Sequence, residues 1–230
     1  MVLYEDNHLI IVNKKSGQLV QGDHTRDQTI LDVYKDYIKK KYKKPGAVFL
    51  HPVHRLDRPV SGCVIMARTS KALTRMNELF RKDQVQKTYH MISYDRAYQQ
   101  EGTLVQHIIK DTSKNRSKLA KKGQANAKKA ELSFSLAAAA NAKFLYEVHP
   151  KTGRSHQIRV QMASAGSPII GDLKYGGKKG IDERSIYLHC TSMTFIHPVK
   201  KEEMTVSTLP YKDQIWNEFT GFIKDYLTKR

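Results

Sequence analysis

The stretch His54-Arg55-Leu56-Asp57-Arg58-Pro59-Val60-Ser61-Gly62 places one carboxylate between two arginines, and a turn-forming Pro and Gly follow. Residues 63–67 then form a short apolar run that is typical of a buried strand. A charged loop beside a core strand is a common support for a reactive side chain. An ion-paired surface turn is the alternative, because exposed Arg–Asp pairs are common and contribute about 0–1 kcal/mol. The rest of the chain decides between the two.

The composition indicates a polyanionic partner. The chain has 230 residues, enough for one large domain or two small lobes around a shared core. It carries 40 Lys and Arg against 22 Asp and Glu, a formal charge of +18. Such an excess favours nucleic acid, because Lys and Arg displace counterions from phosphates. No apolar run reaches the roughly 18 residues of a membrane span, and the N-terminus does not have the form of a signal peptide.

Apolar patterning predicts more strands than helices. Strands are expected at residues 8–13, 63–67, 85–92, 131–136, 144–148, 167–170 and 186–189. Helices are expected with N-caps at Asp27 or Thr29, at Ser70 and at Ser155, and a further helix is expected from Asp213 onward. Because the strands cluster as hairpins, we predict an α+β fold with a mixed, mostly antiparallel sheet. No linker or repeat divides the chain, so residues 1–230 are expected to form a single domain.

The two cysteines and a basic run of residues bear on the cellular compartment and on the binding partner. Cys63 and Cys190 lie in apolar, strand-like surroundings, which indicates buried free thiols in a reducing cytoplasm. Residues 110–129 are rich in Lys and Arg, and Asp111 is their only acid. Such a run is typical of a solvated, mobile loop, and contact with RNA or DNA is an equal alternative.

Several chemical classes find no support in the sequence. The chain has no Gly-x-x-x-x-Gly-Lys or Gly-x-Gly-x-x-Gly loop, so we expect no nucleotide cofactor. It has no Cys-x-x-Cys pair, and neither Ser61 nor Ser155 lies in a Gly-x-Ser-x-Gly elbow. His51, His54 and Asp57 stand three apart, as metal ligands on a helix do, but the flanking prolines indicate a loop. We therefore expect neither a metal nor a cofactor.

The remaining candidates are one carboxylate, one aromatic hydroxyl and two arginines, namely Asp57, Tyr89, Arg154 and Arg159. A carboxylate can act as nucleophile or base without a metal. An arginine can keep it ionised in a cleft closed to water, and an aromatic ring can stack on a base drawn out of a nucleic acid. If these groups meet in space, they suit a reaction at the sugar–base bond of a nucleotide.

The motifs carry a resemblance to a known family. Segment 54–62 resembles the His-Arg-Leu-Asp-x-x-Thr-Ser-Gly signature of the RluA family of RNA pseudouridine synthases. Segment 152–159, Thr-Gly-Arg-Ser-His-Gln-Ile-Arg, resembles the family's third motif. Segments around Tyr89 and Leu188 match the family in the same order, and the likeness extends over residues 3–209. Because it begins so early, we expect no N-terminal S4-type RNA-binding domain.

Some positions depart from the family pattern. Val60 stands where Thr is usual, Gln161 where His is usual, Cys190 where Ala is usual, and Lys15 where Pro is usual. None of these changes removes a chemical group that the reaction is thought to need. They therefore concern the subgroup and the substrate rather than the activity.

The resemblance implies a pseudouridine synthase fold: a sheet in two halves, flanking helices and an RNA-binding cleft. It implies isomerisation of specific uridines in rRNA or tRNA, with base flipping and without cofactor or metal, by a cytoplasmic protein expected to be a monomer. Asp57 would be the essential carboxylate, as nucleophile or as base, Tyr89 would stack on the base, and Arg159 would pair with Asp57. The expected substrate contacts are Arg55, Arg58, Lys87, Arg154, His156 and Leu188.

Two other functions stay open on the sequence alone. One is a non-catalytic RNA-binding or RNA-folding protein on the same scaffold, against which the intact set Asp57, Tyr89 and Arg159 argues. The other is a metal-dependent nuclease, against which the lack of a second carboxylate beside Asp57 argues. The sequence identifies neither the target uridine nor the class of RNA.

Overall fold

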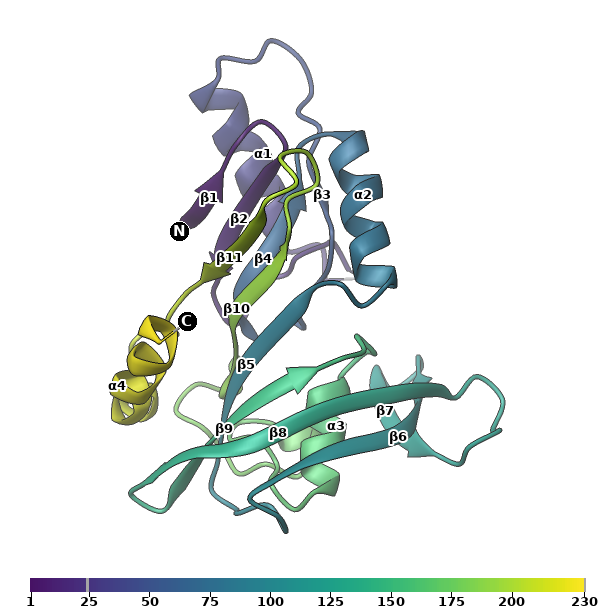
Figure 1. Cartoon of the computed structure of the whole chain (residues 1–230), viewed down its shortest axis with the longest axis vertical. Helices are drawn as coiled ribbons and strands as arrows, with labels where there is room; N and C mark the ends of the chain where they lie inside the picture. Colours follow the sequence, from purple (N-terminus) through teal and green to yellow (C-terminus); the bar gives the residue numbers. More distant parts are fainter. Residues whose placement is uncertain (24, 230) are drawn as a thin grey trace. The chain divides into compact units, whose positions relative to one another are not determined.

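The computed structural model describes residues 1–23 and 25–229, which divide into two compact units. The first unit contains Met1–Gln86 and Ser192–Thr208, and the second contains Lys87–Thr191 and Leu209–Arg230. Within each unit the structure confirms the α+β fold with mostly antiparallel strands (Figure 1). The expectation that residues 1–230 form one domain stays a prediction.

The first unit is built on two strands that are buried at every position, β2 (Leu9–Lys14) and β4 (Ser61–Ala67). They pair antiparallel, and their register places Lys14 opposite Gly62, at the start of β4. Helix α2 (Ser70–Arg81) lies alongside β4 (Figure 1). The other elements of this unit are β1 (Val2–Glu5), α1 (Ile30–Lys41), β3 (His51–Pro52), β11 (Glu203–Ser207) and the later part of β10 (Leu188–Ile196).

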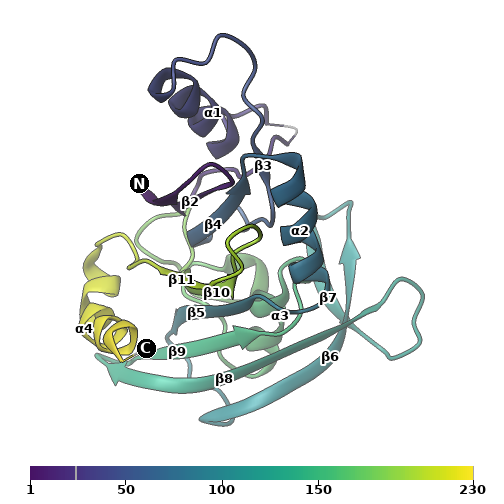
Figure 2. The same cartoon turned by 45° about the horizontal axis from the view of Figure 1, so that its top comes forward.

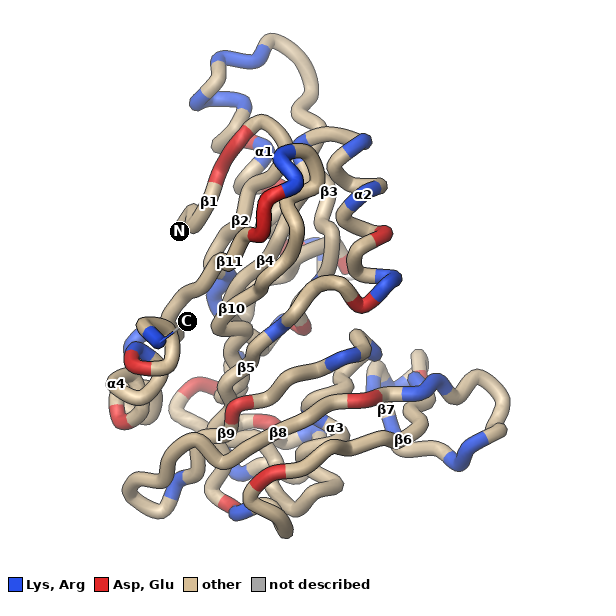
Figure 3. The backbone as a smooth tube through the Cα atoms, in the orientation of Figure 1, with Lys and Arg blue, Asp and Glu red and all other residues tan. Residues whose placement is uncertain are grey.

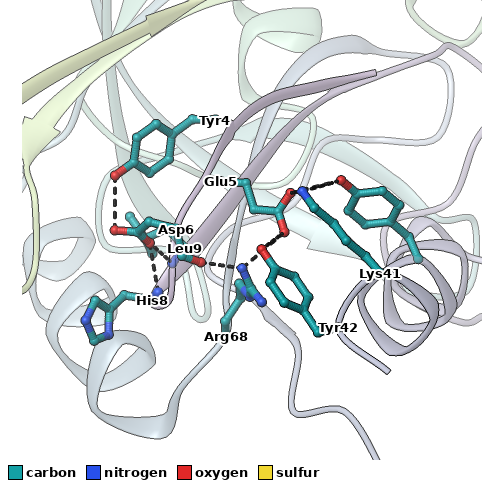
Figure 4. A network of polar contacts seen from close by, with 9 residues as sticks. Tyr4, Glu5, Asp6, His8, Leu9, Lys41, Tyr42 and Arg68 are labelled. Atoms are coloured by element: carbon teal, nitrogen blue, oxygen red, sulfur yellow. Dashed lines mark hydrogen bonds and ion pairs between the residues drawn. The ribbon is translucent and has the colours of Figure 1, made fainter. Parts of the chain in front are cut away.

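Glu5 fastens α1 to β1 (Figure 4). Its carboxylate accepts hydrogen bonds from Tyr37 Oη at 3.0 Å, Lys41 Nζ at 2.7 Å and Tyr42 Oη at 2.8 Å. It also pairs with Arg68 Nη1 at 3.2 Å. Burial alone would raise the pKa of Glu5, but these donors outweigh it and lower the pKa. The carboxylate therefore stays ionised and holds the helix in place.

The second unit is a sheet in the order β5-β9-β8-β6-β7, with every neighbouring pair antiparallel. Helix α3 (Gln157–Ser164) lies against β6 and β7 (Figure 2), where Val160 and Tyr175 pack on Ile108 and Ala130. The strands are β5 (Gln86–Ser93), β6 (Glu101–Asp111), β7 (Arg116–Ala120), β8 (Lys128–Ala140) and β9 (Lys143–Pro150). The remaining elements are the 3₁₀ turn η1 (Leu173–Tyr175) and α4 (Gln214–Thr228).

Several sequence predictions are confirmed. The Asp213 carboxylate caps α4, whose Ile215, Trp216, Phe219 and Ile223 are buried. Thr29 caps α1 and forms a reciprocal capping box with Asp32. Cys63 and Cys190 are both buried, and neither is part of a disulfide. Within the described chain, no helix is both long enough and apolar enough to cross a membrane.

Two predicted helix N-caps, Ser70 and Ser155, are wrong by one residue. Thr69 caps α2, because its hydroxyl accepts from the Ala72 amide at 3.2 Å, so Ser70 is already helical. Helix α3 begins after His156, which has a left-handed backbone with φ 53°. Ser155 is not the cap, and its carbonyl instead accepts a hydrogen bond from Ser117 Oγ at 2.7 Å.

Two predicted segments also differ from the structure. Residues 110–129 are not one loop, because nine of these twenty residues belong to β6, β7 and β8. The sequence pattern missed these strands because their residues in this run are mostly polar or charged, and the buried residue of β7 is Ser117 rather than an apolar residue. Residues 167–170 do not form a strand, and Ser167 Oγ instead bonds the Asp95 carbonyl at 2.9 Å.

Candidate active site

Asp57 lies in the turn that connects β3 to β4 in the first unit. The Val60 amide donates to the Asp57 carbonyl at 3.0 Å, which closes the turn. Leu56 is buried beside it, while the Asp57 side chain is only partly buried. The loop therefore presents its carboxylate from a backbone that is anchored on the core.

Arg58 ties this loop to a second turn. The Gly17 amide donates to the Arg58 carbonyl at 2.8 Å, and Arg58 Nε donates back to the Gly17 carbonyl at 3.1 Å. Gly17 has φ 79°, a backbone conformation that favours glycine. Arg58 Nη2 also pairs with Asp27 at 2.6 Å on the surface. The side chain thus fixes the loop, and its expected contact with RNA stays a prediction.

Lys14 supports the same loop from below. Its side chain is fully buried, and Nζ donates to the carbonyls of Lys15 and Arg58, both at 3.0 Å. Burial lowers the pKa of Lys14 to about 7, although the negative charge of Asp57 acts to raise it. The sequence analysis missed this residue, because a lysine at the end of an apolar strand is usually the start of a surface turn.

His54 holds the loop from the β4 side. Its Nε2 accepts a hydrogen bond from the Ile65 amide at 3.1 Å, and its ring stacks on Phe80 at 5.1 Å between centroids. This arrangement requires an unprotonated Nε2. His54 is thus a support of the loop. Arg55 is exposed and donates from Nη1 to Gln21 Oε1 at 3.3 Å.

Tyr89 and Lys87 stand two residues apart on β5, so they share one face of the second unit's sheet. Tyr89 lies opposite Val148 of β9 and is mostly buried. Leu188 opens β10 and is also buried. The strand framework therefore gives an aromatic ring and an apolar side chain fixed positions.

Arg159 is held by Asp172 through two parallel hydrogen bonds. Arg159 Nε lies 2.7 Å from Asp172 Oδ2, and Nη2 lies 2.8 Å from Oδ1. Both side chains are almost fully buried, with 6% and 1% of their surfaces exposed. This pair does not use Nη1 of Arg159. Sequence reasoning missed Asp172, whose only signal was an acid at the head of a loop rich in glycine and lysine.

Tyr175 joins His156 to Arg159. Its hydroxyl accepts a hydrogen bond from the Ser117 amide at 2.8 Å and forms a second hydrogen bond, also of 2.8 Å, with His156 Nδ1. Burial raises the pKa of Tyr175, which keeps the phenol protonated. The Arg159 guanidinium lies 5.1 Å from the centre of the Tyr175 ring. His156 and Arg159 therefore both contact Tyr175.

The predicted residues fall into two sets. Asp57, Arg55 and Arg58 belong to the first unit. The second unit holds the other six: Lys87, Tyr89, Arg154, His156, Arg159 and Leu188. Within residues 1–23 and 25–229, no three His, Cys, Asp or Glu side chains gather as metal ligands would.

Comparison with known proteins supplies the family. The sequence profile of RNA pseudouridylate synthase matches residues 8–164, well over half of the chain. The ribosomal large subunit pseudouridine synthase C of Buchnera aphidicola is 32% identical over 216 residues, which are 89% of this chain and 65% of that protein. The chain thus spans slightly less than two thirds of that relative's length.

Two further likenesses extend over nearly the whole chain. The tRNA pseudouridine synthase C of Vibrio parahaemolyticus is 29% identical over 96% of this chain and 94% of its own. The solved structure of human RNA pseudouridylate synthase domain containing 4 superimposes with a TM-score of 0.77 at 22% identity, covering 97% of this chain and 92% of that one. This second likeness confirms the predicted pseudouridine synthase fold. The chain belongs to the RluA-type family of RNA pseudouridylate synthases.

Proposed function

We propose that this protein isomerises specific uridines in rRNA or tRNA to pseudouridine. The observation that carries the proposal is Asp57, which stands in the family's signature on a loop held by buried Lys14. The formal charge of +18 supports RNA as the partner, because RNA is a polyanion. The relatives named above supply the two RNA classes.

Asp57 is assigned as the essential carboxylate. It acts either as a nucleophile on the sugar or uracil, or as a base that removes a sugar proton. The bond between C1′ of the ribose and N1 of uracil breaks, the base turns, and C1′ bonds to C5. The proton on C5 leaves and N1 gains one, so the product has the same atoms as the substrate and no cofactor is needed.

The second unit supplies the groups that receive the base. Tyr89 stacks on the flipped uracil, and Leu188 packs beside it. Asp172 fixes Arg159 through Nε and Nη2. We assign Nη1 of Arg159 to the pairing with the Asp57 carboxylate. A guanidinium at that position would favour the ionised carboxylate. Lys87, Arg154 and His156, with Arg55 and Arg58 of the first unit, are assigned to the flipped nucleotide and its phosphates.

The setting of the reaction is part of the same proposal. We assign the protein to the cytoplasm as a monomer that acts on RNA. Its buried cysteines Cys63 and Cys190, which form no disulfide, suit a reducing compartment.

The test is a map of pseudouridines in cellular RNA from strains with the gene, without it, and with the Asp57→Asn variant. We expect one or a few sites to disappear on deletion, to return with the wild-type gene, and to stay absent with the variant. If the deletion removes no site, the assignment is wrong. If Asp57→Asn restores growth and RNA folding as well as wild type does, the protein acts as a non-catalytic RNA-binding factor.

A further inference from the structure

A cavity of about 230 Å³ opens on the face of the second unit that also carries α3. Its floor is formed by Ile108 of β6 and Ser117 of β7, and three cationic side chains surround it, those of Lys110, Lys128 and Arg154. The other lining residues are Asn126, Gly153 and Ser155. The cavity is thus lined by polar, apolar and cationic residues but by no carboxylate.

The strand register explains why these cations share one face. Lys128 of β8 lies opposite Ile108, and Lys110 lies opposite Ser117. Side chains alternate along a strand, so Lys128 faces the cavity and the adjacent Lys129 faces the other side. Figure 3 shows Lys and Arg gathered along β7 and the neighbouring end of β8. The basic side chains of residues 110–129 therefore lie on both faces of the sheet.

The two faces of this sheet differ in whether their basic side chains have carboxylate partners. On the far face, Lys129 and Lys151 both pair with Glu131, at 2.8 Å and 3.1 Å. On the cavity face, Lys110, Lys128 and Arg154 pair with no carboxylate that the structure describes. Arg154 Nε donates to the Lys129 carbonyl at 2.9 Å, which fixes its guanidinium at the rim. The cavity is therefore a concentrated, uncompensated positive site.

The cavity is joined to the expected active-site residues through Tyr175. The amide of Ser117, a floor residue, donates to the Tyr175 hydroxyl at 2.8 Å. The same tyrosine contacts His156 and the Arg159 guanidinium. An anion bound in the cavity would lie one residue away from Tyr175, which contacts both His156 and Arg159.

We infer that this cavity binds one backbone phosphate of the substrate RNA, close to the nucleotide that is modified. The inference rests on the proposed function and adds a defined phosphate site to it. A volume of about 230 Å³ holds a phosphate group with several waters, at roughly 30 Å³ per water in the liquid. Arginine and lysine together suit a phosphate, one through a planar fork and the other as a point charge.

The experiment compares two adjacent lysines on β8. Lys128→Gln and Lys129→Gln each remove one positive charge from neighbouring positions, and both side chains are exposed. The variants are made in the Asp57→Asn background, so that no turnover occurs during the titration. Binding of a fluorescently labelled RNA stem–loop is measured over a series of salt concentrations, and thermal melting checks that each variant is folded.

We expect Lys128→Gln to weaken binding several-fold and to reduce the slope of log K against log salt by up to roughly 0.7–0.9, the value for the complete loss of one phosphate contact. Lys110→Gln and Arg154→Gln should behave alike, whereas Lys129→Gln should change the slope much less. Equal effects of Lys128→Gln and Lys129→Gln would overturn the inference, because they would indicate general charge attraction. Competition by polyglutamate as effective as competition by unlabelled RNA would assign the cavity to an acidic protein instead.

The two proposals fail in distinguishable ways. If wild-type protein forms no pseudouridine but Lys128→Gln still lowers the salt slope, the proposed reaction is wrong and the phosphate site stands. If pseudouridine forms and the two lysine variants bind alike, the cavity is not a phosphate site and the reaction stands.

Discussion

Lys14 Nζ donates a hydrogen bond to the Arg58 carbonyl at 3.0 Å, from a side chain that has no exposed surface. The carbonyl belongs to the residue that follows Asp57. The loop that carries the candidate carboxylate therefore rests on a buried amine, whose pKa burial lowers to about 7. Its protonation state links the stability of the loop to pH.

Lys14→Met should change how stability depends on pH. The pKa of Lys14 is about 7 in the folded protein and about 10.4 when unfolded, so between these values the unfolded chain binds more protons. The free energy of unfolding should therefore rise with pH, by up to about 3 kcal/mol from pH 7 to pH 9. We expect this rise in wild type and not in Lys14→Met, measured by urea unfolding at several pH values.

The matched control for Lys14 is Lys15→Met, which removes an exposed lysine at the next position. It should keep the wild-type pH dependence. An unchanged pH dependence in Lys14→Met would contradict the assignment of a buried, titrating amine.

Asp172→Asn should destabilise the second unit strongly. It leaves the buried Arg159 guanidinium without its bidentate carboxylate, and breaking a buried pair from one side costs about 3–5 kcal/mol. The control is Asp95→Asn, which breaks a surface pair with Lys178 worth about 0–1 kcal/mol. Urea unfolding of both variants checks the difference, and equal losses would show that the Arg159–Asp172 pair contributes no more than a surface pair.

His54→Ala should slow the reaction more than it weakens RNA binding. It removes the acceptor of the Ile65 amide, and an unsatisfied buried amide costs about 1–3 kcal/mol. Because the loop from His54 to Arg58 carries Asp57, its displacement should lower kcat. His51→Ala, which truncates an exposed histidine of the same segment, should leave kcat unchanged. Equal kcat values for the two variants would show that His54 does not hold the loop in place.

The sequence was sufficient to predict those parts of the structure that depend on residues close together along the chain. The apolar runs of β2 and β4 are buried at every position, and Thr29 and Asp213 cap helices as their residue types predict. The motif around Asp57 was recognisable because its residues are contiguous. Each of these features depends on neighbours within a few positions along the chain.

The missed features depend on contacts that are distant in the sequence. Lys14 is buried because its partner Arg58 lies 44 positions later, and Asp172 is buried because it pairs with Arg159 across a turn. His156, and not Ser155, stands at the start of α3 with a left-handed backbone, where its ring bonds Tyr175. No local propensity predicts that conformation for a histidine.

Single-turnover isomerisation by purified protein tests the central claim most directly. Wild type and Asp57→Asn are incubated with unmodified tRNA and rRNA transcripts, and pseudouridine is measured by mass spectrometry after nuclease digestion. The account predicts pseudouridine at a defined site with wild type, and none with Asp57→Asn, which should still fold and bind the RNA. Pseudouridine formation by Asp57→Asn at a rate comparable to wild type would contradict it.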